Sequence, residues 1–145
     1  MFRSRNFPLP QPHLVGLAAG VVLSALVPRA LIAKPWIGHA VGWPLILSGL
    51  SLAAWAVAAT EAIDMSDPDA LVVGGPYALT RNPMYVAWGV IYLGVTFVVN
   101  TFWLLVLFPA VLFVTHRVVL REERHMEGRF GALYRRYKSV VRRYF

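Results

Sequence analysis

Three long stretches of this chain carry no Asp, Glu, Lys or Arg: residues 6–28, 35–60 and 82–115. A helix that crosses the hydrocarbon core of a bilayer needs about 20 predominantly apolar residues. Each of the first two stretches therefore predicts one membrane span. The third is too long for one ordinary span, and Asn100 interrupts it near its middle. We therefore expect a tight helical hairpin there, and four spans in all.

The composition also favours an integral membrane protein, because 58% of the residues are apolar, 14% are charged and the mean hydropathy is +0.59. We expect one all-α domain over residues 1–145. The absence of cysteine excludes disulfides and cysteine-based chemistry. No His, Asp or Glu set has convincing metal-ligand spacing, so no metal site is expected. The expected segments are spans at about 13–27, 36–59, 83–99 and 101–119, a loop at 60–82 and an amphipathic tail at 120–145.

Small residues recur at a spacing of four in the first two expected spans. Gly16 and Gly20 form one such pair, and Gly38 and Gly42 form another. Glycine lets two helix backbones approach closely in lipid. The pattern predicts close helix packing and indicates no chemistry.

The charges are concentrated after the last expected span. Residues 116–145 contain nine Lys or Arg and three Glu, and Arg3 and Arg5 lie near the other terminus. Basic residues beside a span mark the cytoplasmic side. We therefore expect both termini and the loop at 60–82 to be cytoplasmic. The tail alone could suggest nucleic-acid binding, but polybasic segments beside spans ordinarily face anionic lipid, so no nucleic-acid partner is expected.

Ionisable residues at the ends of spans are costly unless they are solvated or paired. Arg81 follows the turn-rich segment GGPYALT, and Glu122 and Glu123 follow the last span. The expected hairpin would bring these two places together at the cytoplasmic side. A purely structural interpretation is that Arg81 anchors the helix and the Glu pair binds neighbouring arginines. The tyrosines nearby would then form an interfacial aromatic belt.

The combination of elements is more specific than any one of them. GPYxxxRNPMY, an apolar hairpin and REExxxxxRFGxxYxxY follow one another between about Asp69 and Tyr137. This order resembles the isoprenylcysteine carboxyl methyltransferase and phospholipid N-methyltransferase group of membrane methyltransferases. The resemblance implies S-adenosylmethionine in a cytosol-facing pocket, S-adenosylhomocysteine as product, and a lipid-like substrate that enters from the bilayer. It leaves open whether the chain is a monomer or a homodimer.

The resemblance also implies site residues. Glu122 is the expected catalytic carboxylate, and Arg117 or Arg121 would orient an anionic substrate group. Tyrosine faces suit a sulfonium, and carboxylates suit an ammonium or ribose hydroxyls. The expected cofactor contacts are Asp69, Ala70, Leu71, Val72, Tyr77, Arg81, Asn82, Pro83, Met84, Tyr85, Glu122 and Glu123.

The chain departs from the pattern of this group at two informative positions. Asn82 stands where the group usually has histidine, and Val118 stands where its carboxyl methyltransferases have arginine. We expect methyl transfer of the isoprenylcysteine carboxyl methyltransferase type. The alternatives are methylation of a phospholipid amine and, from another class, a non-enzymatic membrane protein whose basic tail binds anionic lipid or a partner.

Overall fold

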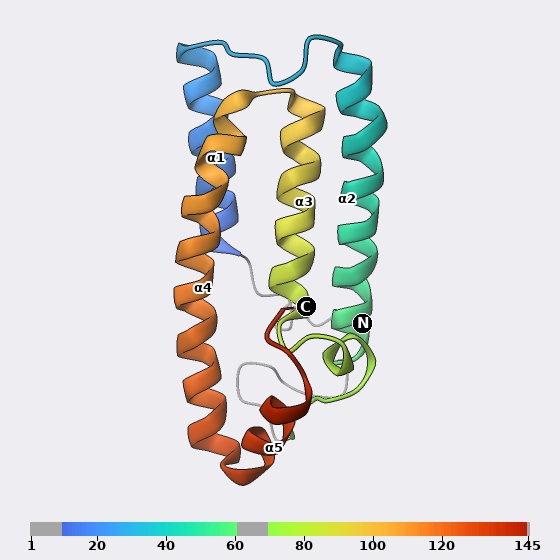
Figure 1. The fold of residues 1–145 in the computed structure, drawn as a ribbon, viewed down its shortest axis with the longest axis vertical. Coiled ribbons are helices and arrows are strands. Elements are labelled where there is room, and N and C mark those ends of the chain that lie inside the picture. The colour runs from blue at the N-terminus through green and yellow to red at the C-terminus, as the bar shows by residue number, and fades with distance from the viewer. Residues whose placement is uncertain (1–9, 61–69, 145) are drawn as a thin grey trace.

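A computed structural model describes residues 10–60 and 70–144. These residues form five α-helices and one 3₁₀ helix, without a strand among them (Figure 1). Proline begins or nearly begins α1, α2 and α3, where its fixed φ suits the first helical turn. The helices are α1 (Gln11–Leu26), α2 (Pro35–Ala58), η2 (Gly75–Ala78), α3 (Pro83–Val99), α4 (Phe102–Phe130) and α5 (Ala132–Val140).

The four long helices coincide within a few residues with the four expected spans, up to the start of the tail. By length and composition, α2 and α4 can each cross a bilayer. The other two, α1 and α3, are apolar but have only 16 and 17 residues. An all-helical fold is therefore confirmed, with two candidate spanning helices among the residues described, and four spans are not established.

The tail differs from the expected single amphipathic helix at 120–145. Instead α4 continues to Phe130, and Gly131 adopts φ +53°, a conformation that L side chains rarely adopt and that ends the helix. Nine residues then form α5, and Val141 is extended. Residues 141–144 turn back toward the start of α3 (Figure 1). This break separates Arg142 and Arg143 from the helix on which a continuous basic face was expected.

Two helix pairs make up the bundle, and glycines bring each pair together as predicted. In the pair α2 and α3, a Cβ at Gly42 would lie 2.6 Å from the carbonyl oxygen of Gly94. In the pair α1 and α4, a Cβ at Gly20 would lie 2.9 Å from Cγ of Leu104. Tyr92 of α3 joins the pairs, since its ring stacks on Phe108 and its hydroxyl donates to the Leu104 carbonyl at 3.1 Å.

The turn between α3 and α4 closes the end of the bundle remote from α5. Asn100 has φ +53° and occupies this turn. Its side-chain amide donates to the carbonyl of Ile32 and accepts from the amide of the same residue, at 2.9 and 2.8 Å. The connection between α1 and α2 is thereby fixed to the hairpin, and the cavity described next lies at the opposite end.

Candidate cofactor and substrate pocket

A cavity of about 560 Å³ lies where α2 ends, α3 begins and the charged end of α4 meets α5. Apolar atoms make up most of its wall. The hairpin therefore does bring the Arg81 loop and the glutamate pair together. Asp69 lies outside the described residues. The predicted residues on the wall are Ala70, Leu71, Val72, Tyr77, Arg81, Asn82, Pro83, Met84, Tyr85, Arg121, Glu122 and Glu123.

Other wall residues were not among the predicted contacts. Tyr134 and Tyr137 of α5 are buried on one side of the cavity. Both belong to the FGxxYxxY block, so the sequence did contain a signal for them. The end of α2 contributes Ala56, Val57 and Thr60, and α4 adds His125 and Met126. Nothing in the sequence pattern pointed to the α2 residues.

Arg117, predicted to orient substrate, is exposed on α4 and does not line the cavity. It precedes Arg121 by about one turn of the same helix. Arg121 does line the cavity. Of the two arginines, only Arg121 is in a position to meet a molecule held there.

The loop before α3 enters the cavity wall through η2. Gly75 has φ +58°, and Tyr77 follows with 9% of its surface exposed. The hydroxyl of Tyr137 donates to the carbonyl oxygen of Tyr77 at 2.6 Å, which connects the loop to α5. Burial, together with the charge of Glu122, raises the pKa of Tyr77 to about 12. The phenol therefore stays neutral and presents an aromatic surface at physiological pH.

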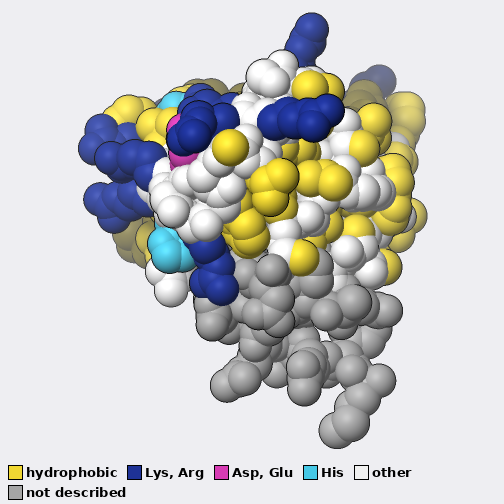
Figure 2. Space-filling model, turned by 90° about the horizontal axis from the view of Figure 1, so that it is seen from below, with side chains coloured by type: hydrophobic (Ala, Val, Ile, Leu, Met, Phe, Trp, Pro, Cys, Tyr) yellow, Lys and Arg dark blue, Asp and Glu magenta, His cyan; other side chains and the backbone are white. Residues whose placement is uncertain are grey.

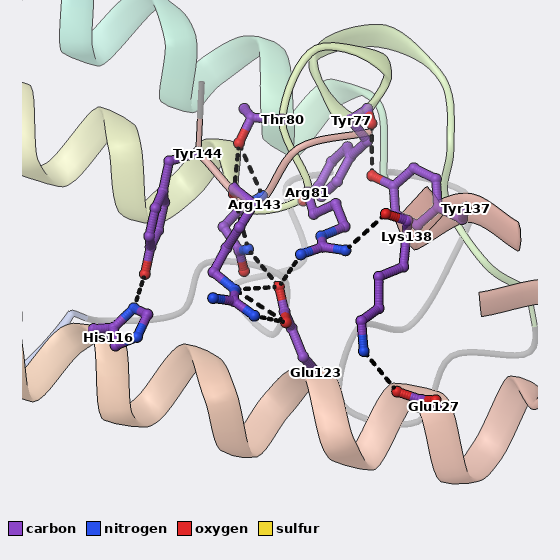
Figure 3. A network of polar contacts seen from close by, with 11 residues as sticks. Tyr77, Thr80, Arg81, His116, Glu123, Glu127, Tyr137, Lys138, Arg143 and Tyr144 are labelled. Atoms are coloured by element: carbon purple, nitrogen blue, oxygen red, sulfur yellow. Dashed lines mark hydrogen bonds and ion pairs between the residues drawn. The ribbon is translucent and has the colours of Figure 1, made fainter. Parts of the chain in front are cut away.

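Glu123 is enclosed by three donor side chains (Figure 3). Its side chain is 7% exposed, and both of its oxygens accept hydrogen bonds from guanidinium nitrogens of Arg143, at 3.0 to 3.1 Å. Arg81 contributes Nη2 at 3.2 Å, and Asn82 contributes Nδ2 at 3.4 Å. This cluster places two cations around one anion. We call it the Glu123 cluster: Arg81, Asn82, Glu123 and Arg143.

The Arg81 side chain has a donor left over. Only 6% of that side chain is exposed, and its Nη1 donates to the carbonyl of Lys138 at 3.2 Å. Its Nε is buried and has no hydrogen-bond partner among the described residues. An unsatisfied buried donor on a charged group is costly, so an acceptor from a bound molecule would stabilise it.

Glu122 is in a different environment although it is the next residue. Its carboxylate faces the cavity and accepts the Tyr85 hydroxyl at 2.7 Å. The two glutamates lie beyond the apolar part of α4, which ends near Val119. Although Glu122 is partly exposed, partial desolvation of its carboxyl raises its pKa, an effect that the hydrogen bond from Tyr85 partly offsets. For Glu123, burial would also raise the pKa, but the hydrogen bonds from Arg143 and Asn82 and the charges of Arg81 and Arg143 lower it overall.

The neighbouring carboxylates are therefore suited to different tasks. Glu123 is a fixed anion whose oxygens are already engaged. Glu122 is free to accept a proton or a cation from a molecule in the cavity.

A family model described as phospholipid methyltransferase matches residues 37–132 of the chain. The matched region covers nearly all of α2 together with η2, α3 and α4, and it ends at the start of α5. No curated protein and no solved structure matches.

Proposed function

The chain belongs to the phospholipid methyltransferase family, and from that premise we propose that it transfers a methyl group from S-adenosylmethionine to a lipid-like substrate. The observation that carries this proposal is the cavity itself. It gathers the RNPMY segment at the start of α3 and the REE segment at the end of α4 around one apolar space, next to helices that suit a membrane. A volume of 560 Å³ also falls within the range of small-molecule pockets, about 300–1,000 Å³.

The chemistry of the wall fits this cofactor. The buried Nε of Arg81, which has no hydrogen-bond partner among the described residues, would donate a hydrogen bond to its carboxylate. The neutral rings of Tyr77 and Tyr85 would stabilise its sulfonium by cation–π attraction. Because the oxygens of Glu123 are engaged by protein donors, we give that residue an indirect role.

S-adenosylmethionine supplies a methyl group that is already activated on sulfur. The protein then has to align the acceptor and exclude water, and it needs few acid–base groups. Val57, Leu71 and Met84 give the wall the apolar surface for that. Glu122, kept in place by Tyr85, is the group that would take up a proton.

We propose that the methyl acceptor is an amine on an amphipathic molecule. An ammonium acceptor must lose a proton before its nitrogen can attack, and Glu122 offers a carboxylate with a raised pKa for it. A carboxylate acceptor would instead need a free cation. Arg81 and Arg143 both bind Glu123, and Val118 stands where a carboxyl methyltransferase would have arginine. Methylation of a prenylcysteine-type carboxylate is therefore the second candidate. Arg121, an arginine of the cavity wall outside the Glu123 cluster, would then bind the carboxylate.

The orientation belongs to the same proposal. Seen from the α5 end, Lys and Arg side chains outnumber the acidic ones on the visible surface (Figure 2). The positive-inside rule then favours this end, with the cavity, on the cytoplasmic side of the bilayer. A substrate carrying an acyl or prenyl chain could reach the cavity while its tail stays in lipid.

Calorimetric titration of the detergent-purified protein with S-adenosylhomocysteine tests the proposal. We expect saturable binding at one site per chain, greatly weakened by Tyr85→Ala. Arg117→Ala is the control, because Arg117 is exposed and outside the cavity. Absence of binding by folded protein would refute the enzyme and favour a membrane protein that binds anionic lipid or a partner.

Transfer of a labelled methyl group then identifies the acceptor. Vesicles that contain a primary-amine phospholipid are compared with vesicles that contain a prenylated cysteine carboxylate. Labelling of the carboxylate alone would refute the assignment of an amine acceptor but would still support methyltransferase activity.

A further inference from the structure

Residues 141–144, here called the return segment, follow α5 and are hydrogen-bonded to the residues just before α3. The carbonyl oxygen of Arg142 accepts the amide of Arg81 at 2.9 Å. The carbonyl oxygen of Arg143 accepts the hydroxyl of Thr80 at 2.9 Å and Nδ2 of Asn82 at 3.1 Å. Three consecutive loop residues are thus held by two consecutive carbonyls. Figure 3 shows the contacts of Arg143 with Thr80 and Glu123.

The side chain of Arg143 extends this connection to α4. Its Nε lies 3.1 Å from each Glu123 oxygen, and its Nη2 lies 3.0 Å from Oε2. A guanidinium presents donors in a planar fork that matches a carboxylate, which fixes the orientation of both groups. Tyr144 provides a second attachment to α4, through a contact of 3.0 Å between its hydroxyl and Nδ1 of His116.

Arg143 itself is not part of the cavity wall, whereas its partners Arg81, Asn82 and Glu123 all are. Its side chain therefore acts on the orientation of a bound molecule through those partners and not by direct contact. Nor does the family match extend to the return segment, because it ends at residue 132. The resemblance accordingly assigned no role to Arg143.

We infer that Arg143 is a positioning residue for the cofactor: by fixing Glu123 it orients Arg81 and Asn82 toward the cavity. The inference rests on the proposed function. In the intact cluster, the carboxylate of Glu123 is shared by two guanidinium groups. If Arg143 is removed, Glu123 is left to Arg81 and Asn82, and Arg81 is drawn more fully to Glu123. Arg81, which lines the cavity, then no longer has the orientation that the shared carboxylate gives it.

The experiment measures the Kd of S-adenosylhomocysteine for four variants of the full chain at a temperature where each is folded. The variants are Arg143→Ala, Glu123→Gln, the double variant that combines them, and Arg135→Ala. Arg135 is exposed on α5 and matches the loss of one positive charge without touching the cluster. Arg143→Ala should weaken binding at least about tenfold, since a hydrogen-bonded charge pair is lost. Arg135→Ala should leave the Kd within about twofold, because exposed charges interact weakly through water.

The double variant shows whether Arg143 acts through Glu123. If it does, Arg143→Ala should change the Kd by less than about threefold in the Glu123→Gln background, because neighbouring residues in one network are coupled. Equal effects in both backgrounds would overturn the inference, and so would an unchanged Kd in Arg143→Ala with only a lowered Tm.

Two further results separate the remaining possibilities. If Glu123→Gln does not fold, Arg143→Lys takes its place. Lysine keeps the positive charge but lacks the two parallel donors of the guanidinium. Arg143→Lys should therefore bind S-adenosylhomocysteine several-fold more tightly than Arg143→Ala. Equal Kd values for these two variants would contradict the inference. Failure of the unaltered chain to bind would overturn the proposed function and this inference with it. Binding by the unaltered chain that Arg143→Ala does not weaken would overturn the inference alone.

Discussion

The contacts of the Glu123 cluster predict that one substitution lowers the stability of the fold strongly. Substitution Glu123→Gln removes the carboxylate that Arg81 and Arg143 share and nearly preserves the shape of the side chain. The side chains of Glu123 and Arg81 are only 7% and 6% exposed, so Arg81 would keep a buried charge without its anionic partner. We therefore expect a large loss of folding free energy.

The magnitude follows from the burial of the partners. Breaking a buried ion pair by removing one partner costs about 3–5 kcal/mol. Two features favour the lower end of this range: glutamine still offers an acceptor oxygen, and the Arg143 side chain is 31% exposed and can be hydrated. For a chain of this length each kcal/mol corresponds to about 2–4 °C, so Tm should fall by about 6–12 °C.

The assay is thermal unfolding in detergent, followed by the fluorescence of the five tryptophans. Glu127→Gln is the matched control, because it makes the same substitution on the same helix. The Lys138–Glu127 pair has side-chain exposures of 42% and 32%, and such a surface pair is worth about 0–1 kcal/mol. Its Tm should change by less than about 4 °C by the same conversion. Equal shifts for the two variants would refute the view that the Glu123 cluster stabilises the fold.

Three other predictions follow from neighbouring contacts. Glu122→Gln should lower kcat about 100-fold in the methyl-transfer assay, since it removes the proton acceptor. It should leave Tm unchanged or slightly raised, because partial desolvation disfavours the ionised form of Glu122 in the folded state. A Tm loss as large as that of Glu123→Gln would contradict the assigned roles. The folded pKa of Glu123 is lowered, so its stabilisation is complete above the unfolded value of 4.5 and is lost as the pH falls through the folded value. The Tm gap between the unaltered chain and Glu123→Gln should therefore be constant between about pH 6 and 8 and shrink below about pH 4.5, and a gap that widens in acid would count against this. Gly94→Ala should lower Tm by several degrees, because its Cβ would lie 2.8 Å from backbone atoms of Gly42 and Ile46. Gly89→Ala should leave Tm unchanged, because a Cβ there would have nothing within 4 Å. Similar Tm values for both variants would argue against close packing of α2 and α3.

Part of the site could be predicted because its components lie in recognisable segments. The RNPMY segment and the glutamate pair flank one apolar hairpin, and a hairpin brings its two ends together. The contribution of α2 could not be predicted in this way. Ala56 and Val57 are ordinary apolar residues, and their place on the cavity wall depends on the packing of α2 against α3.

The tail was harder to predict than the spans because its conformation depends on one glycine and on distant partners. Its hydrophobic spacing favoured a continuous amphipathic helix. Gly131 adopts a positive φ and ends α4. The path of the return segment is then fixed by hydrogen bonds to residues some 60 positions earlier. Helical periodicity describes neighbours three or four residues apart and carries no information on such contacts.

The sequence by itself determined the helices and the membrane methyltransferase family, because charge-free runs and local motifs are properties of adjacent residues. The tertiary structure decided how the two glutamates differ. Successive residues of an α-helix point about 100° apart, so Glu122 faces Tyr85 and the cavity while Glu123 faces Arg81 and Arg143. Arg143 lies 20 residues from Glu123 in the chain and reaches it only because the chain turns back after α5. The electrostatic environment of each carboxylate is set by the groups that folding brings to it, and these are absent from its neighbourhood in the sequence.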